Sequence, residues 1–186
     1  MGTDLRADPL RLELPLPTTA MAIMPHRDPE RALELAFTLD IPFWPQLPNI
    51  SYSEDTYVQT VAGFPGAVVD HEGLRILLDE EAFYAGLEEY LELDHVDERF
   101  AVTPAQSLTY AGFLERASPH YPALRGQFMG PISLALMVKD ADNKPVIYRD
   151  DVREMLIHHV ARRVNRHLSD LRALNPRSFV WVDEPG

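Results

Sequence analysis

The chain has 186 residues, 46% of them hydrophobic and 25% charged, and its 17 Lys and Arg against 29 Asp and Glu give a formal net charge of −12. This composition predicts one globular domain over residues 1–186. The acidic balance argues against binding to nucleic acid or an anionic membrane surface, since both are bound through clustered cations. The sequence has no cysteine, which excludes a disulfide framework, a thiolate nucleophile and zinc ligation by Cys of this chain.

The start of the chain carries no sign of a targeting segment. Residues 1–25 include Asp4, Asp8 and Glu13 and lack the basic start and the uninterrupted apolar core of a signal peptide. No apolar run approaches the ~18 residues that a membrane span needs. We therefore expect a cytoplasmic protein without a membrane segment, with residues 1–17 as an irregular lead-in.

Short apolar runs alternate with segments of helical periodicity along the chain. The runs predict strands at residues 18–24, 41–47, 67–70, 74–78, 124–128 and 178–182. Apolar residues at steps of three or four predict helices at residues 29–39, 79–91, 103–117 and 150–173. Residues 132–138 fit either a helix or an extended segment.

Local signals support several of these elements. Asp28 and Pro29 are a favoured N-cap and first helical residue for the helix over residues 29–39. His71-Glu72-Gly73 separates the two strands of a small hairpin. Thr103 and Gln106 have the spacing of a capping box, which favours a helix start at Thr103.

Strands that alternate with helices imply a parallel β/α arrangement. We count about four β/α units and a small hairpin insertion. The predicted fold class is therefore α/β. In such folds the active-site groups gather at the carboxyl ends of the parallel strands.

Three of these strand ends carry side chains suited to a small-molecule site. Asp183 and Glu184 follow the last strand and could bind an ammonium group or serve in acid–base chemistry, unless they are a solvated acidic pair. His26 precedes a helix start, where it could bind an anion or simply bond to the neighbouring backbone. Gln46 follows two aromatic residues that suit a pocket wall as well as a core.

The long helix over residues 150–173 carries His158, His159 and His167. Because arginines stand between them, they are not expected to bind a metal ion, and we interpret them as part of a partly solvated helix face. Asp140 begins a calcium-loop-like stretch, but Lys144 and Pro145 occupy positions that require an oxygen ligand and a glycine. We therefore predict no metal site in this chain.

Taken in order, several motifs resemble the catalytic domain of cobalamin-independent methionine synthase, which shares a barrel superfamily with uroporphyrinogen decarboxylase. The motifs are Thr18-Thr19 with Pro25, residues 41–47, Gly63-Phe64-Pro65-Gly66, Gly126-Gln127 with Gly130-Pro131-Ile132-Ser133, and Val182-Asp183-Glu184-Pro185. The resemblance covers the chain from about Thr18 onward. It implies a partial (β/α)₈ barrel, a half-barrel of about four units.

The resemblance also implies roles for individual residues. Met21, Ala22 and Ile23 would line an amino-acid site, and Asp183 would hold the ammonium group of the substrate. Ala22 and Ile23 stand where the family has Gly and Ser, whose backbone groups help to hold the substrate carboxylate. Glu54 matches a family glutamate loosely. With His26, Gln46 and Glu184, these residues make up the candidate substrate-binding set, and no catalytic residue is assigned.

The resemblance implies the substrate-binding half of a methyltransferase of methionine biosynthesis. Such an enzyme transfers a methyl group to a thiol such as homocysteine, from 5-methyltetrahydropteroyltriglutamate or a corrinoid. The zinc ligands of the family lie in the other half, so zinc is expected only if a second half supplies His, Cys and Glu. A barrel needs ~200–250 residues, so we expect a truncated product, a second-half chain or a homodimer. The alternatives are a uroporphyrinogen-decarboxylase-like enzyme and a non-catalytic binding or assembly subunit.

Overall fold

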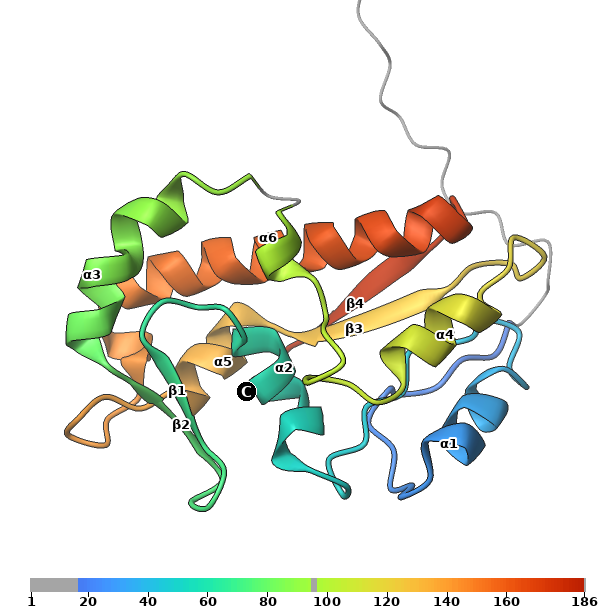
Figure 1. Ribbon diagram of the computed structural model, residues 1–186, viewed down its shortest axis with the longest axis horizontal. Coiled ribbons are helices and arrows are strands. Elements are labelled where there is room, and N and C mark those ends of the chain that lie inside the picture. The colour runs from blue at the N-terminus through green and yellow to red at the C-terminus, as the bar shows by residue number, and fades with distance from the viewer. Residues whose placement is uncertain (1–16, 95–96, 186) are drawn as a thin grey trace, which may run out of the picture.

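The computed structural model describes residues 17–94 and 97–185, and the protein is a mixed α/β structure (Figure 1). The lead-in expected over residues 1–17 lies outside the described residues except for Pro17. The described helices are α1 (Pro29–Ala36), α2 (Thr56–Val61), α3 (Glu80–Leu91), α4 (Tyr110–Arg116), α5 (Pro131–Met137) and α6 (Asp150–Leu174). The strands are β1 (Ala67–Asp70), β2 (Arg75–Leu78), β3 (Arg125–Met129) and β4 (Phe179–Asp183). Among these helices none is long and apolar enough to cross a membrane.

Four parallel segments lie side by side in the order of the sequence. β3 and β4 pair in parallel over their whole length. Single parallel bridges join Phe43 to Arg125 and Ile23 to Gln46. The first two segments are therefore much shorter than the strands predicted at residues 18–24 and 41–47. The prolines of the second run supply no amide hydrogen for a longer ladder.

The hairpin and the long helix confirm their predictions. β1 and β2 pair antiparallel, with Ala67 opposite Leu78. The helix α6 begins at Asp150, as predicted, and ends at Leu174, one residue later than predicted. In α1, the Asp28 carboxylate accepts from the amide of Glu30 at 3.0 Å, as an N-cap should. This helix ends at Ala36, earlier than predicted. Residues 131–137 are helical.

The helix predicted to start at Thr103 is wrong, because α4 begins only at Tyr110. The Thr103 amide does donate to Gln106 Oε1 at 3.1 Å, but the residues form a turn and not a helix. Tertiary bonds hold these residues outside a helix. The Leu108 amide, which a helix would use, donates to Glu54 at 2.5 Å, and the Thr109 side-chain hydroxyl donates to the Pro45 carbonyl at 2.5 Å.

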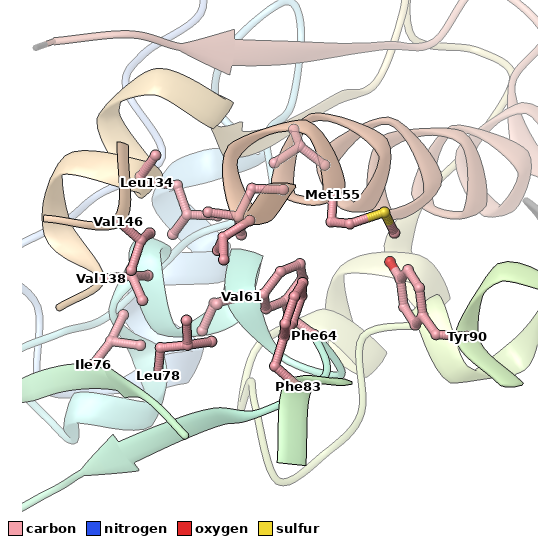
Figure 2. Close-up of a cluster of buried hydrophobic side chains, with 14 of the residues drawn as sticks. Val61, Phe64, Ile76, Leu78, Phe83, Tyr90, Leu134, Val138, Val146 and Met155 are labelled. Carbon is pink, nitrogen blue, oxygen red and sulfur yellow. The ribbon is translucent and has the colours of Figure 1, made fainter. Parts of the chain in front are cut away.

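The apolar core forms clusters, two of which pack against α6. One cluster joins the hairpin, α2, α3, α5 and α6, as Figure 2 shows with Phe64, Phe83 and Met155. A second cluster packs Trp44, Phe128 and residues of α4 against α6. The hairpin and α3 lie at one end of the molecule, and α1 and α4 at the other (Figure 1).

A stripe of polar side chains on α6 is buried, which corrects the prediction of a partly solvated histidine face. His159, Arg163 and His167 stand one turn apart and are at most 1% exposed, whereas His158 is exposed. His159 Nε2 lies 2.9 Å from the Thr60 carbonyl, which can only accept. His159 Nε2 therefore carries the proton, and Nδ1 accepts from the Tyr90 hydroxyl at 2.7 Å.

Candidate functional site

The carboxyl ends of the parallel segments carry the residues that the sequence predicted for a substrate site. Asp183 ends β4 and stands opposite Met129 at the end of β3. The Gly130 amide donates to the Asp183 carbonyl at 2.7 Å, which fixes the end of β4 to the start of α5. This edge of the sheet is where parallel β/α folds place their ligands.

The Asp183 carboxylate is half-buried and makes no hydrogen bond or ion pair with residues 17–94 or 97–185. Its charge still acts on a neighbouring element. Burial chiefly raises the pKa of Tyr57 in α2, and the charges of Asp55, Asp183 and Glu184 raise it further. Asp183 therefore lies near α2 with a carboxylate free to accept hydrogen bonds from a ligand.

The Glu184 side chain has a structural role at the start of α5. Its two carboxylate oxygens accept from the amides of Ile132 at 3.0 Å and Ser133 at 2.8 Å, in the first turn of α5. A Cβ at Gly130 would lie 2.1 Å from Cδ of Glu184, so only glycine lets the carboxylate approach this closely. Glu184 thus caps α5 and ties it to the end of β4.

Replacing Glu184 by alanine is expected to lower the free energy of unfolding by about 1 kcal/mol, because two amides of α5 lose their acceptor. Urea unfolding at pH 7 measures the change. Glu88→Ala on the exposed face of α3 is the matched control, and it should change stability by less than about 0.5 kcal/mol. Equal stabilities of the two variants would contradict the capping role.

A hydrogen-bonded amide network joins three of the parallel segments. Gln127 of β3 is fully buried, and its Oε1 accepts from the Ala22 amide at 3.2 Å. Gln46 Nε2 donates to Gln59 Oε1 at 2.8 Å and approaches the Gln127 carbonyl at 3.4 Å. The structure therefore brings two predicted site residues, Ala22 and Gln46, to a common neighbour, Gln127.

Glu54 extends this network toward α4. It is 2% exposed, and it accepts from the Leu108 amide at 2.5 Å and from Gln59 Nε2 at 3.4 Å. Burial raises the pKa of Glu54, and these hydrogen bonds offset part of that rise. The contacts of Glu54 therefore hold the segment before α4 against α2.

The remaining predicted residues lie at the rim. The side chains of Met21 and Ile23 are 48% and 41% exposed. His26 is half-buried in the loop before α1, and its Nδ1 has no partner among the described residues. The structure does not connect His26 to the amide network.

Sequence reasoning missed Arg125, which is 2% exposed at the start of β3. Its guanidinium donates to Gln127 Oε1 and to the Ala20 carbonyl and lies 5.0 Å from the ring centre of Trp181. Burial lowers the pKa of Arg125, and the charge of Asp183 offsets part of this shift. No described carboxylate forms an ion pair with Arg125. Its apolar neighbours in the sequence gave no sign of this role.

A groove of about 300 Å³ opens elsewhere on the molecule, between α4, α6 and the segment before α4. Tyr110 donates to Asp170 at 3.0 Å in its wall, and Arg166 bonds both Asp170 and Glu98. None of the residues predicted for the site lines this groove. In the described part of the chain, no group of three or more His, Asp or Glu is placed to hold a metal ion.

In a comparison with known proteins, no family model, no curated protein and no solved structure matches the chain.

Proposed function

We propose that this chain is one half of a (β/α)₈ barrel and supplies the substrate-binding residues of a methionine-synthase-like methyltransferase. Its substrate would be an amino acid or thiol such as homocysteine. A complementing half would close the barrel, and it would supply a metal site only if it carries His, Cys and Glu ligands. The observation that carries the proposal is the Asp183 carboxylate at the carboxyl end of a parallel strand, which has no hydrogen-bond or ion-pair partner among the described residues. The ordered motifs that resemble the methionine synthase family support the same substrate class.

Contacts between the first and third parallel segments support the barrel part of the proposal. Gln127 reaches past the segment of Gln46 to the amide of Ala22, two segments away. Arg125 reaches the Ala20 carbonyl in the same direction. In (β/α)₈ barrels the interior layers are built from alternate strands, and contacts between the first and third segments fit that pattern.

Two groups of the site would contact an amino-acid substrate. The Asp183 carboxylate would accept hydrogen bonds from the ammonium group, a charge-assisted contact. The Gln127 Nε2 is buried and has no hydrogen-bond partner in the described part of the chain, so it is a spare donor beside the Ala22 backbone. This donor would hydrogen-bond to the carboxylate of the substrate. It lies beside Ala22, which stands where the family has a residue whose backbone helps to hold that carboxylate.

Calorimetric titration of the chain with homocysteine tests the proposal. We expect binding, and we expect Asp183→Asn to weaken it at least about tenfold, because a charged hydrogen bond is worth ~1.5–3 kcal/mol. Glu88→Gln on α3 removes the same charge far from the strand ends and should leave the affinity unchanged.

Absence of homocysteine binding, or equal affinities of the parent chain and Asp183→Asn, would refute the substrate assignment. Binding of a porphyrinogen in place of the amino acid would favour the uroporphyrinogen-decarboxylase-like alternative. Neither outcome depends on zinc, so the test applies to this chain by itself.

A further inference from the structure

Within residues 17–94 and 97–185, the sheet of four parallel segments has two edges without a paired strand. On β4, the Phe179 amide and the Asp183 carbonyl bond to the β3 side, so Val180 and Val182 direct their backbone groups outward. At the other edge, Ala22 and Met24 bond to Gln46, and Ile23 faces outward. Among the described residues, nothing accepts or donates at these outward positions.

Apolar side chains stand exposed at both edges. Trp181 and Val182 of β4 are 48% and 42% exposed, and Met21 and Ile23 are 48% and 41% exposed. An unpaired edge with exposed apolar residues is a template for another strand. Each edge therefore has the backbone groups and the apolar surface that strand pairing would bury.

The charges at the two edges are complementary when the strands run parallel. β4 is preceded by Arg177 and ends in Asp183 and Glu184, whereas the first segment is followed by His26 and Arg27. Arg27 is exposed and, like Asp183, has no partner in the part of the chain that the structure describes. A parallel arrangement places the basic end of the first segment beside the acidic end of β4.

We infer that a second copy of this chain covers both edges, with β4 of each copy beside the segment 22–24 of the other. A twofold axis parallel to the strands achieves this and keeps all the strands parallel. Four segments from each copy make eight, the number that closes a (β/α)₈ barrel. Twofold dimers are also the commonest homo-oligomers. The inference rests on the half-barrel part of the proposed function.

Light scattering combined with residue-resolved hydrogen exchange tests the pairing. We expect twice the 21.1 kDa mass of the chain at high protein concentration. In that state the amides of Ile23 and Val182 should exchange at least about tenfold more slowly than after dilution to monomer. Trp181, whose amide faces β3, is the internal reference and should be protected in both states.

Arg27→Glu tests the charge complementarity at the joined edges. It should raise the dissociation constant at least about tenfold, because like charges would then meet at the carboxyl ends. Lys144→Glu makes the same charge change in an exposed loop, where the Lys144 ammonium group pairs with Asp142, and should leave the dissociation constant unchanged.

Three results would overturn the inference. A monomer at all concentrations with fast exchange at Ile23 and Val182 would leave the edges uncovered. A dimer with slow exchange at Val182 but fast exchange at Ile23 would mean that two β4 strands pair with each other. Equal effects of Arg27→Glu and Lys144→Glu would remove the predicted contact.

The dimer and the substrate assignment can fail independently. A monomer that binds homocysteine would refute only the dimer, and a dimer that does not bind homocysteine would refute only the substrate assignment.

Discussion

Replacing Arg163 by methionine is expected to lower the free energy of unfolding by about 3 kcal/mol or more. The Arg163 guanidinium is fully buried in α6 and donates to the carbonyls of Phe100 at 2.7 Å, Ala101 at 2.9 Å and Gln59 at 2.6 Å. Each buried acceptor left without a donor costs ~1–3 kcal/mol. Relief of the buried charge offsets part of the loss, since burial lowers the pKa of Arg163 to about 10.

Urea unfolding at pH 7 measures this effect, and Arg162→Met is the matched control. Arg162 is the adjacent residue of α6, is only partly buried, and donates to the Tyr90 carbonyl at 2.7 Å. We expect a loss of about 1 kcal/mol for Arg162→Met. A loss for Arg163→Met no larger than this would show that the three carbonyls find other donors or water.

The second large effect concerns acid stability. Burial lowers the pKa of His159 and of His167 to about 3, with the charge of Arg163 as the next cause for both. An unfolded histidine titrates at about 6.5, so between pH 6.5 and 3 the unfolded chain binds protons that the native chain does not. Native stability therefore falls as the pH falls through this window, by about 1.4 kcal/mol per pH unit for each histidine.

Between pH 7 and 5 the two histidines together should remove about 4 kcal/mol of stability. The aspartates whose pKa is lowered, Asp40 and Asp151 among them, act only below about pH 4. The raised pKa of Glu54 acts in the opposite direction, because the native state then holds a proton that the unfolded state releases.

Urea unfolding of the parent chain at pH 7, 6 and 5 measures the slope. His158→Gln, on the exposed side of α6, should keep the full slope, and His167→Gln should remove about half of it. Because His167→Gln also loses a bond to the Tyr110 hydroxyl, only its slope is compared, not its absolute stability. A parent chain equally stable at pH 7 and 5 would contradict the account of the buried histidines.

Sequence patterns predicted the elements whose stability is mostly local. The hairpin of β1 and β2 and the long helix α6 follow from alternation, turn residues and helical periodicity. The start of α4 did not follow, because Glu54 and Pro45, distant in sequence, bind the residues before it. The burial of His159 and His167 was missed for the same reason, since their Tyr partners come from α3 and α4.

The candidate site could be placed by topology but not resolved in detail. A strand that ends in Asp183 predicts a carboxylate at the edge of a parallel sheet, and within residues 17–94 and 97–185 this carboxylate has no hydrogen-bond or ion-pair partner. The neighbouring Glu184 has the same chemistry, yet it caps α5, which only the fold reveals. Gln59 carries no sequence signal, and Gln127 stands in a motif to which no site role was assigned, because a buried amide network depends on contacts between distant segments.

The most direct test of the central claim is a nuclear magnetic resonance titration of the chain with homocysteine, read as changes in amide chemical shifts. We expect the changes to concentrate at the carboxyl ends of the parallel segments, at Ala22, Gln127, Met129 and Asp183. Changes confined to the groove lined by Tyr110, Arg166 and Asp170, or no changes at all, would contradict the assignment of the strand ends as the substrate site.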